Sequence, residues 1–372
     1  MFYAADDCDL AAFEAQINQE LNASDVPLAF SIEKNIPLYD ASTLEPNDAL
    51  KREWAWVLGD GSGVLVIKNS YAETDTLDQA AEIFHRIIAD EKEQSGGGGD
   101  HFAAAGANDR IWNSLQKLCL ADPSVFAGNF GNPFMALVCE AWLGPAYQMT
   151  AQVNLVRPGG KAQTAHRDYH LGFMTEEQAL AFPAHAHALS PVLTLQGAIA
   201  HCDMPLESGP TKLLPFSQNY GPGYLAYRRA EFADLFEERF VQLPLEKGDL
   251  LFFNPALFHG AGDNVSKDIQ RLGNLVQVSS AMGRAMESLD RDAMCKAVYP
   301  VLLGQPDGPE RDAVIAAAAE GYSFPTSLDS DPPIGGLAPK TQADLMREGL
   351  AEGHDPATFA TALDALNKRK KP

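Results

Sequence analysis

The sequence predicts a mainly β core with additional helices: a jelly-roll or cupin-like barrel flanked by helices at both ends. Three observations lead to this prediction. Between about residues 148 and 282, short strand-like runs alternate with turn signals. No helical pattern of the βαβ kind separates most of these runs, and helical spacing is concentrated toward the two ends of the chain. Short strands joined by turns are typical of an antiparallel double sheet or barrel, of which the jelly roll is the common eight-stranded form.

Turn sequences such as RPGG, ESGP, EKGD and GDNVS separate the strand-like runs. Two irregular insertions, at 171–190 and 216–238, are expected at the mouth of the barrel. The eight predicted strands span 148–158, 161–167, 192–202, 211–215, 239–245, 249–254, 257–262 and 272–280.

The segment 1–147 is predicted to be mainly helical, because apolar residues recur there at three- and four-residue spacing, most clearly in 8–22, 75–94 and 110–120. One buried strand is expected in it at 61–69 (GSGVLVIKN). The glycine-rich stretch 95–109 is expected to be a loop, with a flap over a pocket as the alternative.

Helical character returns in 283–372, at 311–322 and 341–353, and the final NKRKKP is expected to be a solvated basic tail. We therefore expect a single catalytic domain with an N-terminal helical region (1–147), a jelly-roll core (148–282) and a C-terminal helical extension (283–372).

Composition and charge restrict the function classes. The chain has 372 residues, of which 46% are hydrophobic, so it can bury a sizeable core. Fifty acidic against 28 basic residues give a formal charge of −22, which disfavours nucleic acid or a membrane as partner. Five scattered cysteines predict neither a disulfide framework nor a structural zinc site. With no signal-peptide pattern at the start and no long apolar run, we expect a soluble, cytoplasmic protein.

The sharpest motif is His166-Arg167-Asp168, followed 91 residues later by His259. Residues i and i+2 of a strand project to the same face, so His166 and Asp168 can point together into a barrel, with His259 arriving from a facing strand. Two imidazoles and one carboxylate form the facial triad of non-haem iron(II) enzymes, which leaves positions open for a bidentate 2-oxo acid and dioxygen.

Arg271 strengthens this interpretation because it lies 12 residues after His259, at the start of the next predicted strand. A guanidinium suits a fixed, bidentate grip on a carboxylate and stays charged at neutral pH. We expect it to bind the distal carboxylate of 2-oxoglutarate. Ser266, between the two, could donate a further hydrogen bond.

Three segments together resemble the phytanoyl-CoA dioxygenase family of Fe(II)/2-oxoglutarate-dependent oxygenases: QTAHRDYH (163–170), ESGPTKLLPFS (207–217) and GDLLFFNPALFHGAGDNVSKDIQR (248–271). The resemblance implies a double-stranded β-helix. It also implies that His166, Asp168 and His259 are the catalytic iron ligands and that Arg271 anchors the co-substrate. Where the family usually reads Pro-Gly-Ser-His, this chain has Pro-Phe-Ser-Gln at 215–218.

The resemblance implies a reaction that uses O2 and 2-oxoglutarate, hydroxylates an unactivated C–H bond, and releases succinate and CO2. Halogenating relatives lack the carboxylate, so Asp168 favours hydroxylation. Two alternatives stay open at this point. A cupin-like metal isomerase or hydrolase would need the triad but not Arg271, and a metal-binding barrel could have no catalytic role.

Further polar residues are candidates for the site. Asn154 follows Gln152 at the same-face spacing, as Gln196 follows Thr194. Each has a structural alternative, such as a strand–turn hydrogen bond, a rim position or a salt bridge, and His185 and His187 are expected in a surface or loop role. The cofactor-binding candidates are Asn154, Gln163 and Thr194, and the substrate-binding candidates are His170, Gln196, Arg110 and Arg284.

The expected substrate is a small polar or weakly anionic molecule. An acyl-CoA is disfavoured because no basic cluster is present for its phosphates. The C-terminal helices could pack against a second subunit, so a homodimer is one expected assembly.

Overall fold

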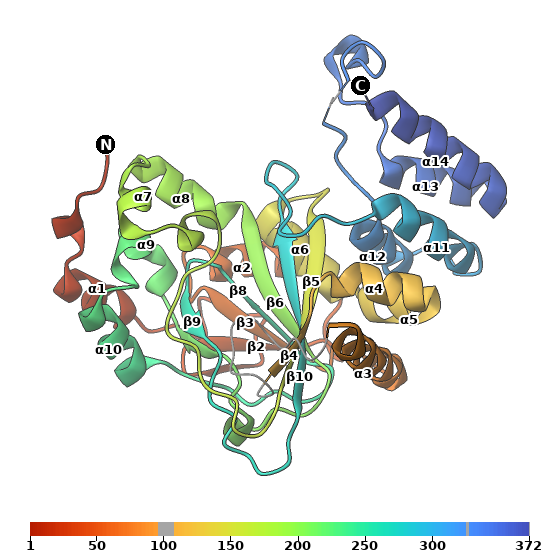
Figure 1. Ribbon diagram of the computed structural model, residues 1–372. Coiled ribbons are helices and arrows are strands. Elements are labelled where there is room, and N and C mark those ends of the chain that lie inside the picture. The colour runs from red at the N-terminus through yellow and green to blue at the C-terminus, as the bar shows by residue number, and fades with distance from the viewer. Residues whose placement is uncertain (96–107, 325–326, 372) are drawn as a thin grey trace.

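The computed structural model describes residues 1–95, 108–324 and 327–371 (Figure 1). Most of the predicted connection at 95–109 lies outside these ranges, so its role as loop or flap stays a prediction. Within the described ranges, no helix combines the length and the apolar character that crossing a membrane requires.

Most strands belong to one large sheet with the order β1-β2-β3-β8-β6-β10-β5-β4, in which only β2 and β3 pair in parallel. A second sheet pairs β7 (Lys212–Leu214) with β9 (Phe258–Gly260). The strands of the large sheet are β1 (Ser31–Glu33), β2 (Ile36–Asp40), β3 (Val64–Lys68), β4 (Asn108–Ile111), β5 (Gln148–Val156), β6 (Thr194–Ala200), β8 (Leu250–Phe253) and β10 (Arg271–Ser279).

The described strands form no closed barrel, so the expected jelly-roll barrel is not confirmed. The large sheet is open, with β1 and β4 at its edges. Of the eight predicted strands, 161–167 and 239–245 form only isolated bridges, such as His166 with His259 and Val241 with Leu213. In 239–245, Pro244 has no backbone N–H with which to extend a strand ladder. The segment 161–167 lies along a cavity and does not pair continuously with another strand. The fold is therefore a mixed α/β arrangement around a large, mostly antiparallel sheet.

The segment 1–147 contributes more strands than expected. The predicted strand at 61–69 is confirmed as β3, but β1, β2 and β4 also join the large sheet. The helix predicted over 110–120 begins only at Ser114, because residues up to Ile111 belong to β4. Its helices are α1 (Leu10–Ile17), α2 (Asp48–Leu58), α3 (Asp75–Ser95), α4 (Ser114–Ala121), α5 (Pro123–Phe130) and α6 (Pro133–Leu143), with the short η1 (Ala5–Asp7) before them.

The two insertions expected to be irregular are largely helical. Figure 1 shows that they lie beside α1, at the opposite side of the sheet from α11–α14. Phe13 of α1 packs with Phe232 and Phe258, so the N-terminal helix covers the segment that carries His259. The helical elements of the insertions are η2 (His170–Phe173), α7 (Glu176–Leu180), α8 (Ala184–Val192), η4 (Ser217–Asn219), α9 (Gly223–Ala226) and α10 (Ala230–Arg239). The short η3 (Leu206–Ser208) lies between the two insertions.

The C-terminal part is helical, as expected. The predictions at 311–322 and 341–353 are confirmed as α12 (Pro309–Ala318) and α13 (Gln342–Glu352). Sequence reasoning missed α11 (Arg291–Leu303) and α14 (Pro356–Lys370), and η5 (Ile334–Gly336) precedes α13. Most of the expected basic tail is the last turn of α14, where cations stabilise the negative end of the helix dipole.

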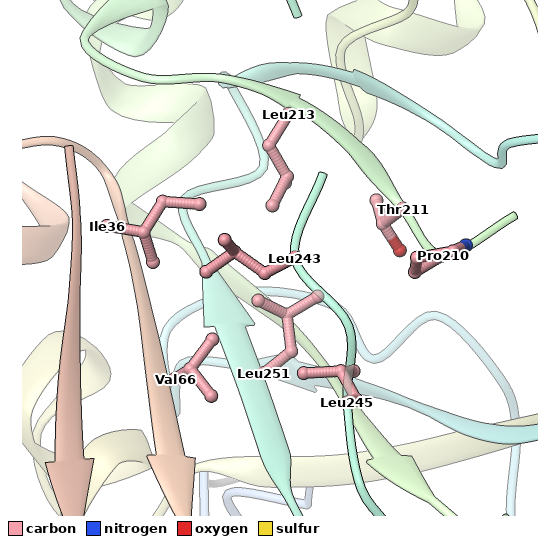
Figure 2. A pocket seen from close by; sticks show the side chains of 8 residues that line it. All are labelled: Ile36, Val66, Pro210, Thr211, Leu213, Leu243, Leu245 and Leu251. Atoms are coloured by element: carbon pink, nitrogen blue, oxygen red, sulfur yellow. The ribbon is translucent and has the colours of Figure 1, made fainter. Parts of the chain in front are cut away.

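Apolar side chains hold the small sheet against the large one. Figure 2 shows where they meet, around a void of about 10 Å³. A void this small and apolar is expected to be dry. The eight side chains around it come from β2, β3 and β8 on one side and from β7 and the neighbouring loops on the other: Ile36, Val66, Pro210, Thr211, Leu213, Leu243, Leu245 and Leu251.

Candidate metal centre and its cavity

A cavity of about 1100 Å³ lies against one face of the large sheet. Because successive strand residues alternate between faces, β10 presents Arg271, Gly273, Leu275 and Gln277 to it in a row. β4, β5, β6 and β8 contribute further side chains, and the segment 159–169 lies along the cavity. The row on β10 gives the cavity a cationic end at Arg271 and an amide-lined end at Gln277.

His166, Asp168 and His259 also line this cavity. One ligand atom from each lies within 4.8 Å of the other two. The Asp168 Oδ2 atom is 3.8 Å from His166 Nε2 and 3.6 Å from His259 Nε2. The bridge between His166 and His259 sets this geometry, since it brings the two backbone segments together. The motif and the distant histidine therefore meet as the sequence predicted.

Backbone carbonyls orient both imidazoles. His166 Nδ1 lies 3.0 Å from the Thr164 carbonyl oxygen, and His259 Nδ1 lies 2.8 Å from that of Leu257. A carbonyl only accepts, so each Nδ1 carries the proton and each Nε2 presents its lone pair toward the other two side chains. This is the tautomer that a metal ligand needs.

The protonation states also suit a cation. Burial lowers the pKa of His166, and the neighbouring His259 lowers it further, so the imidazole is neutral at neutral pH. Burial acts to raise the pKa of Asp168, but electrostatic interactions with His259 and His166 and the hydrogen bond from Gln196 outweigh it, so the pKa lies below its usual value. Gln196 Nε2 also donates a 2.7 Å hydrogen bond to Asp168 Oδ2.

Arg167, between the two ligands of the motif, points away from them. Its guanidinium is buried, donates to the backbone carbonyls of Ser217 and Tyr220, and lies over the rings of Tyr224 and Phe258. These contacts fix the backbone on which His166 and Asp168 sit. Sequence reasoning gave Arg167 no role.

The segment Pro-Phe-Ser-Gln, which departs from the family pattern, supports the same region. Phe216 adopts a left-handed φ of 68° at the position where the family usually has glycine. Ser217 Oγ accepts a hydrogen bond from the backbone N–H of Phe258. The Gln218 amide donates to the carbonyls of Gly59 and Gly61, which joins this segment to the loop before β3.

Arg271 is a buried cation that pairs with no carboxylate among the described residues. Its side chain is 7% exposed and donates a 2.9 Å hydrogen bond to the Ser208 carbonyl oxygen. Within the described ranges, no carboxylate oxygen lies within 4.0 Å of it, although burial lowers its pKa only to about 10. It therefore stays charged at neutral pH and offers an anion site at one end of the cavity.

Four of the further candidates line the cavity, namely Asn154, Gln163, Gln196 and Arg110. Asn154 Oδ1 is buried without a partner in the structure, and Gln163 Oε1 accepts from the backbone N–H of Ala261. Arg110 donates to Gln152.

The other four candidates do not line it, so the structure does not support the roles expected for them. Ser266 Oγ is used inside the β9–β10 turn, where it donates to Asn264. Thr194 is buried at the start of β6, outside the cavity lining, and its carbonyl accepts from Trp142. His170 bonds to Ser190, and Arg284 is exposed. A strand pattern fixes the face of a residue but not how far along the strand a cavity extends.

Gln277 and Tyr169 line the cavity but were not singled out from the sequence. For Gln277 a signal existed, since it lies six residues after Arg271 on one strand and so shares its face. Tyr169 follows the motif directly. Burial raises its pKa well above the usual value, so its phenol is a neutral hydroxyl.

Comparison with known proteins places this geometry in context. Residues 59–272, more than half of the chain, match the family model described as phytanoyl-CoA dioxygenase (PhyH). No curated protein sequence matches the chain.

Among solved structures, the chain is similar to the non-heme α-ketoglutarate-dependent epimerase SnoN from nogalamycin biosynthesis, at 18% identity and a TM-score of 0.43, over 63% of this chain and 84% of that one. It is also similar to AviO1 from Streptomyces viridochromogenes Tue57, at 15% identity and a TM-score of 0.43, over 65% of this chain and 100% of that one. It is similar as well to EvdMO1, at 17% identity and a TM-score of 0.40, over 59% of this chain and 47% of that one.

Proposed function

The chain belongs to the phytanoyl-CoA dioxygenase family, and from that premise we propose that it hydroxylates an unactivated C–H bond of a small molecule. It is a member of the Fe(II)/2-oxoglutarate-dependent oxygenase superfamily, with iron(II) and 2-oxoglutarate as cofactors and O2 as co-substrate. When bound, these groups supply the oxidising chemistry: 2-oxoglutarate is converted to succinate and CO2, and one oxygen atom enters a C–H bond.

In this proposal His166, Asp168 and His259 hold the iron. The observation that carries it is the donor set itself: two imidazoles with free Nε2 lone pairs and one carboxylate, all within 4.8 Å. Mixed nitrogen and oxygen ligation with open positions suits iron(II) better than a closed structural metal site. Asp168 keeps the third protein ligand in place, which favours hydroxylation over halogenation.

Arg271 binds the distal carboxylate of 2-oxoglutarate in this proposal. The guanidinium is buried, charged and without a carboxylate partner among the described residues, and Ser208 orients it. The next residue on the same face of β10 is Gly273, whose missing side chain leaves space along the cavity beside the anchor. A metal isomerase or hydrolase would have no use for such a cation, which makes Arg271 the residue that separates the two alternatives.

We also propose that the open sheet and the small β7–β9 sheet together are an incomplete form of the double-stranded β-helix. The division into regions at 147 and 282, a homodimer and a cytoplasmic location stay predictions.

The test is the visible absorption spectrum of anaerobic protein loaded with iron(II), before and after addition of 2-oxoglutarate. We expect a weak charge-transfer band, because a 2-oxo acid that chelates iron(II) produces one. Arg271→Ala should weaken 2-oxoglutarate binding by about 2–5 kcal/mol, since a buried charge pair loses one partner. Arg86→Ala, which removes an exposed arginine from α3, is the matched control and should leave binding unchanged.

Two results would contradict the proposal. Iron binding without a new band would favour the isomerase or hydrolase, and failure to bind iron would contradict the triad. Once a substrate is found by succinate release, a product formed under ¹⁸O2 must carry the labelled atom, and an unlabelled product would exclude hydroxylation.

A further inference from the structure

A chain of hydrogen-bonded side chains crosses the cavity face of the large sheet at the end opposite Arg271. Arg110 on β4 donates to Gln152 Oε1 on β5 at 3.1 Å. Gln152 Nε2 donates in turn to Gln277 Oε1 on β10 at 3.0 Å. On the next strand, β6, Gln196 Nε2 donates to Asp168. Gln277 and Gln196 are direct cross-strand partners, so the two parts of the chain lie side by side.

The chain is interrupted between these two glutamines. The Gln277 Oε1 atom accepts the hydrogen bond from Gln152, but within the described ranges the Gln277 Nε2 group has no acceptor. The Gln196 amide uses its nitrogen, and its Oε1 atom is buried without a hydrogen bond among the described residues, as is the neighbouring Tyr169 hydroxyl. Both side chains line the cavity and are only 7% and 9% exposed. Buried polar groups are normally paired, so the buried Gln196 Oε1 atom, with the unused Gln277 donor on the neighbouring strand, indicates a missing polar group.

We infer that a substrate hydroxyl group occupies this gap, accepting a hydrogen bond from Gln277 Nε2 and donating one to Gln196 Oε1. This inference rests on the proposed function and names its substrate class, a neutral, hydroxyl-bearing small molecule. It replaces the expectation of a weakly anionic substrate. Because Gln196 also bonds to Asp168, the hydroxyl would be held close to the metal centre, and the oxidised C–H bond would be near it.

Hydrogen-bonding capacity distinguishes a hydroxyl from other substrate groups at this position, because a hydroxyl can both donate and accept. A carboxylate only accepts hydrogen bonds, so it would meet the Gln196 oxygen and the Asp168 carboxylate unfavourably. An ammonium only donates, so it would oppose the Gln277 amide. A ketone satisfies Gln277 but leaves the Gln196 oxygen unpaired, and an alkyl group leaves both unpaired.

The remaining cavity can cover a carbon framework. Trp112, Phe173 and Met286 line it together with the amides, and Phe173 is largely exposed. Apolar side chains around a few polar groups are typical of small-molecule sites, in which the polar groups fix orientation.

The test uses three ring compounds of similar size with the anaerobic enzyme loaded with iron(II) and 2-oxoglutarate: cyclohexanol, cyclohexanone and cyclohexanecarboxylate. Binding is followed by the change in the visible charge-transfer band and by thermal stability. We expect cyclohexanol to bind about tenfold more tightly than the other two, the difference that one well-made hydrogen bond produces.

Gln277→Glu keeps the acceptor for Gln152 but removes the donor, so it should abolish the preference for cyclohexanol. Gln277→Met, which preserves side-chain length without a new charge, is the second variant and should do the same. Gln79→Leu removes an exposed glutamine from α3 and should leave the preference unchanged.

The outcomes separate this inference from the proposed function. If no band forms with 2-oxoglutarate, the proposed function is wrong and the inference falls with it. If the band forms, three results would overturn the hydroxyl inference alone: cyclohexanol binds no better than cyclohexanone, no compound perturbs the band, or the Gln277 variants keep the preference.

Discussion

Two backbone carbonyls fix the orientation and the tautomer of the two histidine side chains in the site. The carbonyls of Thr164 and Leu257 each lie two residues before the imidazole that they accept from. Each histidine is therefore oriented by its own strand segment, and the tautomer does not depend on distant packing. Asp168 differs, because its partner Gln196 comes from another strand.

His201 allows a test of burial at the scale of one residue. It is buried at the end of β6, its Nδ1 lies 3.2 Å from the Leu77 carbonyl oxygen, and its ring packs on Phe84. Burial lowers its pKa from 6.5 to about 4. Between pH 6.5 and about 4, His201 is therefore protonated in the unfolded chain but neutral in the folded protein. The stabilisation is present above pH 6.5 and is lost as the pH falls toward 4.

Between pH 6.5 and pH 4, the titration of His201 should lower the free energy of unfolding by about 3 kcal/mol. His201→Gln, which cannot titrate, should show a correspondingly smaller loss when unfolding by denaturant is measured at pH 7 and pH 4. An identical pH dependence of the two proteins would show that His201 is not the group responsible.

At the scale of elements, the motif is held by glycines of two neighbouring helical segments. A Cβ atom at Gly223, the first residue of α9, would lie 2.0 Å from Arg167 Cζ, and one at Gly172 of η2 would lie 2.0 Å from the Arg167 carbonyl oxygen. These close approaches let the Arg167 side chain reach the carbonyls of Ser217 and Tyr220. The insertions are therefore part of the support for the metal ligands.

We expect Gly223→Ala to destabilise the fold by about 1–3 kcal/mol, because the added methyl group must displace a buried guanidinium. It should also weaken iron binding, since Arg167 lies between two of the proposed ligands. Gly304→Ala, at the end of α11 where a Cβ meets only an ordinary contact, is the control. Both are measured by chemical denaturation and by iron titration, and equal effects of the two would contradict the role of Arg167.

At the scale of the whole molecule, helices flank the large sheet on both sides (Figure 1). His166, Asp168 and His259 line the cavity on one of its faces. A ligand that binds only the folded state must therefore stabilise the entire fold. This applies even though the three proposed metal ligands belong to two distant parts of the sequence.

Mn(II), a redox-stable substitute for iron(II), should raise the free energy of unfolding by about 2.7 kcal/mol at a hundred times its dissociation constant. Asp168→Ala should abolish most of this gain. His185→Ala, which removes an exposed imidazole, should keep it. A gain that persists in Asp168→Ala would show that the metal binds elsewhere.

The sequence by itself identified the proposed metal-binding motif, the anchor candidate and most strands of the core. His166 and Asp168 are recognisable because two residues apart on an extended segment face the same way, and Arg271 because it starts a clearly apolar strand. The spacing of residues along the sequence is enough to recognise these features. The same kind of spacing also identified β3, α3, α12 and α13.

Only the tertiary structure decided which strands pair and what lies behind the ligands. The sequence could not show that β10 lies between β5 and β6, because pairing depends on contacts between distant segments. For the same reason it could not show that Gln277 faces Gln196, or that Arg167 turns away from the metal site. The expected jelly-roll barrel is not confirmed, because two of its predicted strands form only isolated bridges. Hydrogen bonding to a partner strand is not encoded in either strand alone.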